Sequence, residues 1–332
     1  MSTLNITHYD RILFDLLPHL SGYKSYSGGE GAAYFIDDNF VVKEYTKNFL
    51  KRDPDLFDAI FNEYCTEIQN FSNQGFSVPK IYAWMKIPNL NTEKVRSGDE
   101  MEFKYYILEE KIPGRWIYYF HEDLEEMYNV CKNVCSEESF YKAIWIKEGN
   151  HKLRKEILMA YISDYLHMNQ KLESMADDEL EKFIISAYKM AFSGVYSGPD
   201  LFRKNVLVGD SRITLIDNRV RDEMFMDLDE IDDYFLVSLI DLIEYNKFLD
   251  NNLLLSLNDC SLYDESVEKL LTENRKVCLA LTEKVMNILN KKMGLSPVKN
   301  EFIYSDIESM INGTFQDDAE QIIPLIQTEF DK

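Results

Sequence analysis

The first third of the chain alternates apolar and polar positions in the way expected of strands joined by tight turns. The segment Tyr23–Tyr45 has small residues at its centre, an Asp-Asp-Asn turn and then an apolar strand over Phe40–Tyr45. A helix is predicted over about Asp55–Ser72, because its apolar residues recur at steps of three and four. Two further strands, KIYAWMKI and Phe103–Leu108, are expected to form a hairpin around the polar loop PNLNTEKVRSGDE.

The pattern changes after Pro113-Gly114 and becomes mostly helical up to the end of the chain. One short β-like stretch, Val206–Ile216, interrupts these helices and contains two apolar strands around the turn GDSR. A small β-rich half with one helix therefore precedes a larger helical half. We predict an α+β fold of two lobes, residues 1–112 and residues 113–332.

Composition narrows the class of protein. The chain has 332 residues, of which 45% are hydrophobic and 13% aromatic, so a folded protein is expected. The net charge of −22 argues against a nucleic-acid partner, because a phosphate backbone is bound by Lys and Arg. No signal peptide is evident at the N-terminus, and the strongest apolar run, Phe235–Ile243, is too short to cross a membrane. We expect a cytoplasmic protein with no membrane partner.

Much of the negative charge lies in one segment, Asp222–Asp233, which carries seven acids in twelve residues. This segment is either a solvated acidic surface or a surface that attracts a cationic substrate or a basic protein. The five scattered cysteines suit a reducing compartment. Cys131 and Cys135 have no second pair at comparable spacing, so a zinc site is not predicted.

Two features near the N-terminus suit the binding of phosphate. Gly28, Gly29 and Gly31 lie between two predicted strands, where glycine lets the backbone N–H groups approach an anion. Twelve residues after Gly31, Lys43 lies in the apolar strand FVVKEY, where burial would require an anionic partner. The plainer alternatives are a glycine-rich hairpin turn and an edge-strand lysine that points to water.

The partner of Lys43 is expected on the helix that follows. Glu63 and Glu67 are four residues apart and so lie on one face of that helix. Either carboxylate suits the ammonium group, and we favour Glu63.

The most specific pattern lies in GPDLFRKNVLV and ITLIDNR. Asp200 and Asn205 are five positions apart, and Asp217 follows the second of two short strands. Asn205 and Asp217 supply the oxygen ligands that Mg²⁺ prefers. Asp200 is placed to orient an acceptor hydroxyl or to take its proton.

Together these segments resemble the protein-kinase-like superfamily, which includes protein kinases, bacterial effector kinases and aminoglycoside or choline phosphotransferases. SGGEGAAYF looks like the Gly-rich loop, VVKEY like the strand of the phosphate-binding lysine, and Glu63 like its helix partner. YYILEEKIPG looks like the hinge that contacts adenine, and within it we place Glu109 and Lys111 as cofactor-binding residues.

The resemblance covers about residues 22–220 and continues into the catalytic loop. It implies that Asp200 is the catalytic residue and that Asn205 and Asp217 hold Mg²⁺. The sequence departs from the family at Gly198, where His or Tyr is usual, and the glycine that follows the metal-binding aspartate by two residues is absent. Phe202 also replaces the usual Lys or His, and Lys204 or Arg203 is a candidate for the missing charge.

The resemblance implies an ATP- and Mg²⁺-dependent kinase, of compact bacterial type, acting in the cytoplasm or, for a secreted effector, in the host cytosol. It would move the γ-phosphate of ATP to a hydroxyl of a protein or of a cationic small molecule such as an aminoglycoside. Two alternatives stay open: a pseudokinase that binds a nucleotide or a partner, and the same fold transferring AMP.

Overall fold

The computed structural model describes residues 7–27, 31–45, 57–98, 102–116, 124–143, 151–191, 205–216, 262 and 264–293. These residues form two compact units, each of which is described by itself. The first unit runs to Gly114, and the chain returns to it at Ile185 and again at Thr214. The predicted division at residue 112 into two consecutive lobes does not include these two returns.

The first unit is built on a five-stranded antiparallel sheet in the order β1-β2-β3-β5-β4. Its strands are β1 (Lys24–Ser27), β2 (Gly31–Phe35), β3 (Phe40–Tyr45), β4 (Ile81–Pro88) and β5 (Phe103–Glu110). β3 has the bounds that the sequence predicts, and β4 and β5 form the predicted hairpin. β3 lies inside the sheet, between β2 and β5.

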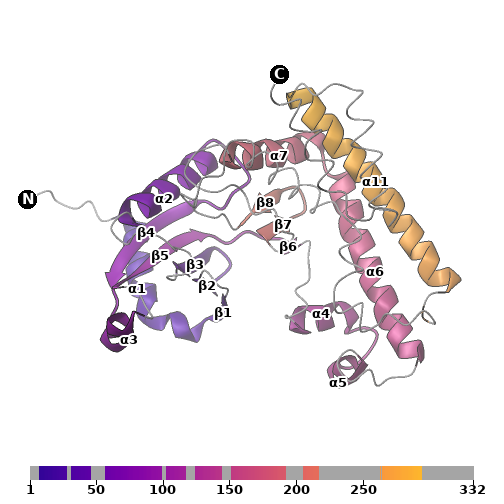
Figure 1. The fold of residues 1–332 in the computed structure, drawn as a ribbon, viewed down its shortest axis with the longest axis horizontal. Coiled ribbons are helices and arrows are strands. Elements are labelled where there is room, and N and C mark those ends of the chain that lie inside the picture. Colours follow the sequence, from indigo (N-terminus) through magenta and orange to yellow (C-terminus); the bar gives the residue numbers. More distant parts are fainter. Residues whose placement is uncertain are drawn as a thin grey trace, which may run out of the picture. The chain divides into compact units, whose positions relative to one another are not determined.

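The two faces of this sheet are covered by different helices (Figure 1). Successive strand residues point to opposite faces, so the odd-numbered residues of β3 and β5 share one face. Helix α2 (Phe57–Asn73) packs there, with the ring of Phe57 3.9 Å from that of Tyr105. The even-numbered residues, Val42 and Leu108 among them, pack with Leu13 of helix α1 (His8–Leu16).

Two helices of the first unit were not predicted. Thr7 caps α1 through a reciprocal capping box with Asp10, and the 3₁₀-helix η1 (Leu17–Gly22) continues it. The polar loop between β4 and β5 also contains a helix, α3 (Thr92–Ser97), so a loop without secondary structure was the wrong interpretation. Asn91 caps its start, and Gly98, with a φ of 78°, ends it in the left-handed region that favours glycine.

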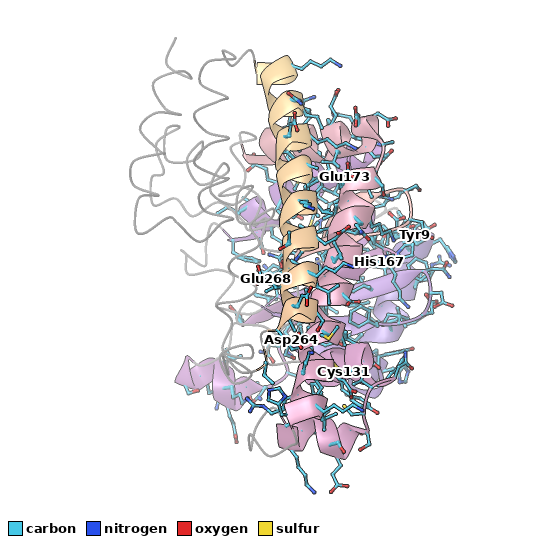
Figure 2. The ribbon with its side chains drawn as sticks, turned by 90° about the vertical axis from the view of Figure 1, so that its right-hand side faces the viewer. Tyr9, Cys131, His167, Glu173, Asp264 and Glu268 are labelled. Atoms are coloured by element: carbon cyan, nitrogen blue, oxygen red, sulfur yellow. The ribbon has the colours of Figure 1, made fainter. Side chains whose placement is uncertain are left out.

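The second unit contains two long helices, α6 (His151–Ser174) and α11 (Glu265–Met293), which lie side by side (Figure 2). Lys155 forms an ion pair with Asp264 at the starts of the two helices. Further along, Asn169 donates a hydrogen bond to Asn274, and Lys284 donates one to the carbonyl of Glu173. Because later residues of α6 meet later residues of α11, the two helices run parallel.

The shorter elements of the second unit are α4 (Leu124–Cys131), α5 (Glu137–Tyr141), β6 (Arg115–Trp116) and β7 (Val206–Val208). β6 and β7 pair antiparallel, and β8 (Ile213–Leu215) follows, with its residues from Thr214 in the first unit. The N–H of Gly209 donates to the carbonyl of Arg212 and closes the predicted turn between β7 and β8. Helix α7 (Asp177–Ala191) begins in the second unit, and its residues from Ile185 belong to the first.

The long helices are not membrane spans. α6 has 24 residues and α11 has 29, but charged residues recur along both. None of the helices in the described ranges is both long enough and apolar enough to cross a bilayer.

Candidate functional site

The described part of the site centres on Lys43. Its side chain is 15% exposed, and its Nζ lies 3.1 Å from Oε1 of Glu109. The same Nζ donates a hydrogen bond to the carbonyl oxygen of Ile216, 173 positions along the chain. The interpretation of Lys43 as an edge-strand lysine in water is therefore wrong, because β3 is an inner strand and the ammonium group has protein acceptors.

The register of the sheet explains why Lys43 meets Glu109. Lys43 lies opposite Ile107 across the β3–β5 ladder, and Glu109 is two residues further along β5 on the same face. The two side chains are thus diagonal neighbours, within reach of a long side chain. Glu109 is buried and Lys43 is partly buried, so their opposite charges compensate each other under α2.

Two hydrogen bonds hold Leu215 and Ile216 in place within the first unit. The ammonium group of Lys43 donates to the carbonyl of Ile216. The N–H of the preceding Leu215 donates to the carbonyl of Ser77 at 2.9 Å. Ser77 lies in the turn between α2 and β4 and is 1% exposed. These contacts fix the chain immediately before Asp217, which itself lies outside the described residues.

Glu63 is not the partner that the structure gives to Lys43. Helix α2 turns Phe61, Tyr64, Cys65 and Ile68 inward, whereas Glu63 is exposed. Glu67 is half-buried, and neither carboxylate is in an ion pair with Lys43. The predicted pairing through the helix is therefore replaced by one within the sheet.

Among the inward-facing residues of α2, Cys65 has a thiol that interacts with the charge of Glu109. Its side chain is fully buried, and burial raises the pKa of its thiol well above the usual value, with the charge of Glu109 adding to the effect. The thiol is therefore neutral at physiological pH. It cannot balance the charge of Lys43, and Glu109 supplies that negative charge instead.

Lys111 has a structural role in the first unit. Its Nζ donates to the carbonyl of Asp37 at 2.7 Å and lies 3.4 Å from Oδ1 of Asp38. Its backbone N–H donates to the carbonyl of Asn39, so it fixes the turn between β2 and β3. Because both its N–H and its ammonium group have these acceptors, the structure offers no support for the predicted cofactor contact of Lys111.

Gly31, the first residue of β2, approaches the neighbouring strand closely. A Cβ at this position would lie 2.1 Å from the carbonyl oxygen of Glu44, well inside van der Waals contact. The structure thus requires a glycine here for the packing of β2 on β3. Gly28 and Gly29, predicted with it to bind phosphate, lie outside the described residues.

Of the predicted catalytic loop, the structure describes Asn205. This residue directly precedes β7, in the second unit, and is 4% exposed. Asp200 and Lys204 lie outside the described residues, as does Asp217. Within the described ranges no three His, Cys, Asp or Glu side chains gather as a metal site would require. The amide oxygen of Asn205 and a carboxylate at Asp217 are hard ligands of the kind that suits Mg²⁺.

Two contacts of the site escaped sequence analysis. The carbonyl of Ile216 is a backbone group, so no residue type marks it in the sequence. Glu109 was predicted to bind the cofactor within the hinge-like segment YYILEEKIPG, but it was not predicted to pair with Lys43. Its pairing with Lys43 depends on the register of β3 against β5, which the sequence alone does not specify.

Comparisons with known proteins add little. No protein-family profile matches the sequence, and no curated protein matches it. Among solved structures, an aminoglycoside phosphotransferase from Alicyclobacillus acidocaldarius is similar, with 11% sequence identity over 93% of this chain and 92% of that chain. The TM-score is 0.27, which is too low for the likeness to support an argument about fold or function.

Proposed function

We propose that this protein is an ATP- and Mg²⁺-dependent phosphotransferase that moves the γ-phosphate of ATP to a hydroxyl group. The observation that carries the proposal is the position of Lys43, between the carboxylate of Glu109 and the carbonyl of Ile216. A buried lysine is thereby fixed beside the segment that leads into Asp217, the predicted metal ligand.

Each predicted residue has a defined chemical task in this proposal. The ammonium group of Lys43 offsets negative charge on the phosphate oxygens of ATP. Asn205 and Asp217 would hold Mg²⁺, which neutralises the charge that develops on the transferring phosphoryl group. Asp200 orients the acceptor hydroxyl and accepts its proton as the oxygen–phosphorus bond forms.

The acceptor belongs to one of two classes, a protein with Ser or Thr or a cationic small molecule. The segment Asp222–Asp233, with seven acids, favours a positively charged acceptor of either class.

The first test is the melting temperature in the presence of ATP, with and without Mg²⁺. A nucleotide at about 100 times its dissociation constant adds roughly 2.7 kcal/mol to the stability of the folded protein. We expect a Mg²⁺-dependent rise in the wild type and a much smaller one in Lys43→Met.

Lys104→Met is the matched control, because this strand lysine pairs with Glu44 at 2.7 Å, on the face of the sheet that carries α1. Its nucleotide-dependent rise should equal that of the wild type. If the wild type shows no rise at millimolar ATP, the phosphotransferase proposal fails and a partner-binding pseudokinase becomes the better explanation. If Lys43→Met behaves as the wild type does, Lys43 does not contact the nucleotide.

A further inference from the structure

The charge balance at Lys43 gives Glu109 a role that differs from the direct cofactor contact predicted from the sequence. We propose that Glu109, on β5, holds the ammonium group of Lys43 in place for the nucleotide phosphates, in the role expected of an acid on the helix. This inference rests on the proposed phosphotransferase function and concerns the same site.

The first argument is the charge that lies next to Lys43. At 15% exposure its side chain is largely removed from water, so an ammonium group there requires a compensating anion close by. The carboxylate of Glu109 supplies that anion at 3.1 Å and is 9% exposed itself. A charge pair of this kind in a low-dielectric setting interacts far more strongly than a surface pair.

The second argument is that α2 offers no acid at the position that faces the pair. The inward residues of α2 are aromatic or aliphatic apart from Cys65, and Cys65 is a buried neutral thiol beside Glu109. Glu63 and Glu67 leave the helix in other directions, and Glu63 is exposed. Bringing either carboxylate to Lys43 would require the helix to rotate and to expose its apolar residues.

The third argument is rigidity. Lys43 and Glu109 belong to adjacent strands that pair from Phe40↔Glu110 to Tyr45↔Tyr105. The backbone ladder therefore sets the separation of the two side chains, independently of the position of α2. The pairing of β3 with β5 therefore sets the position of Lys43, and β5 also forms the first part of the predicted hinge, Tyr105–Gly114.

The test compares variants of Glu109, Lys43 and Glu63, together with one control, for binding of ATP·Mg²⁺ and for slow ATP hydrolysis, measured as KM and kcat. Glu109→Gln removes the charge at nearly constant shape, and Glu109→Asp keeps the charge on a shorter side chain. Glu102→Gln is the control, because Glu102 is an exposed carboxylate directly before β5 and outside the predicted hinge.

We expect Glu109→Gln to weaken ATP·Mg²⁺ affinity about tenfold or more, since a charged hydrogen-bond partner of the phosphate-binding group is lost. The effect should not add to that of Lys43→Met in the double variant, because both changes remove one interaction. Glu109→Asp should recover part of the affinity, which a purely structural role of residue 109 would not explain. Glu102→Gln should bind within twofold of the wild type.

Three results distinguish a failure of the proposed function from a failure of the role proposed for Glu109. No Mg²⁺-dependent ATP binding by the wild type defeats the proposed function itself. The role of Glu109 is overturned if the wild type binds, Lys43→Met abolishes this binding and Glu109→Gln leaves it unchanged. It is also overturned if Glu63→Gln loses as much affinity as Lys43→Met does. If Glu109→Gln does not fold, Glu109→Asp decides: a raised KM supports the role, and an unchanged KM overturns it.

Discussion

Lys43 and Glu109 occupy diagonal positions on two neighbouring antiparallel strands, and their charged groups are 3.1 Å apart under α2. Breaking a buried pair of this kind by removing one partner costs about 3–5 kcal/mol, because the other charge is left uncompensated. The pair is therefore a strong constraint on the first unit.

The metal assignment gives the first prediction. Asp217→Asn replaces a carboxylate by an amide of similar shape, so it would remove a negative ligand from the proposed Mg²⁺ site and leave the volume nearly unchanged. We expect the variant to fold normally and to lose the Mg²⁺-dependent part of the ATP-induced rise in melting temperature. Asp210→Asn is a suitable control, because Asp210 is fully exposed and pairs with Lys171. An Asp217→Asn variant with the Mg²⁺ response of the wild type would remove Asp217 from the metal site.

Local patterns in the sequence predicted the elements that depend on neighbouring residues. The alternation FVVKEY gave β3 with its observed bounds, and the three- and four-residue steps gave α2 within two residues of Phe57–Asn73. The start of α1 and the start of α3 had capping signals at Thr7 and Asn91 that were open to the same reasoning. Their omission was a failure to use a local signal that was present.

Contacts between distant residues were beyond this reasoning. Which acid meets Lys43 depends on the rotation of α2 and on the register of β3 with β5, and a rotation by one residue would change the answer. The hydrogen bond between Asn169 and Asn274 joins two residues that are 105 positions apart in the chain. The sequence pattern around each asparagine does not distinguish it from a surface residue. Such contacts require the tertiary structure.

Gly31 gives a prediction about stability. In Gly31→Ala the new methyl group would lie 2.1 Å from the Glu44 carbonyl oxygen, so β2 and β3 must separate locally. We expect a loss of about 1–3 kcal/mol in the free energy of unfolding, as for other overpacked sites. Gly22→Ala is the control, because no atom lies within 4 Å of a Cβ built at Gly22. Urea denaturation of both variants measures the difference, and equal stabilities would contradict the close approach.

The second unit offers a prediction on its helix pair. Nδ2 of Asn169 donates to Oδ1 of Asn274 at 2.8 Å, and both residues are buried. Asn274→Ala removes the acceptor and leaves a buried amide without it, which costs about 1–3 kcal/mol. Gln170→Ala alters an exposed amide of the same helix, α6, and should change stability by no more than about 0.5 kcal/mol. Denaturation curves that show the same loss for both variants would exclude a special role for the buried pair.

Asp58 gives a prediction that depends on pH. Hydrogen bonds from Lys86 and from the hydroxyl of Tyr105 lower the pKa of Asp58 below its usual 3.8. A lowered pKa in the folded state stabilises the protein above about pH 3.8, and this stabilisation is lost as the pH falls through the folded-state pKa. Because the side chain is 50% exposed, Asp58→Asn should cost no more than about 1 kcal/mol at pH 7.

The difference in stability between the wild type and Asp58→Asn should therefore fall to zero as the pH is lowered from about 5 towards about 2. This is roughly the range over which such a carboxylate becomes protonated. Asp38→Asn, which changes a fully exposed carboxylate, should show no such closing difference. Thermal unfolding at a series of pH values measures both variants. A difference that is constant with pH would mean that Asp58 acts through its shape and not through its charge.

The last prediction concerns the chemical step. Asp200→Ala removes the group that we propose to orient the acceptor hydroxyl and to take its proton, whereas Lys43 and Asp217, which are proposed to contact the nucleotide and the metal, are unchanged. We expect ATP·Mg²⁺ affinity within about threefold of the wild type and phosphate transfer slowed by about 10²–10⁴, the usual contribution of a general base. Asp210→Asn again serves as the control for the loss of an aspartate elsewhere in the chain. Transfer at the wild-type rate would exclude Asp200 as the catalytic residue. A loss of both affinity and transfer would assign Asp200 to nucleotide binding, because a base that acts only in the transition state does not contribute to the ground-state affinity.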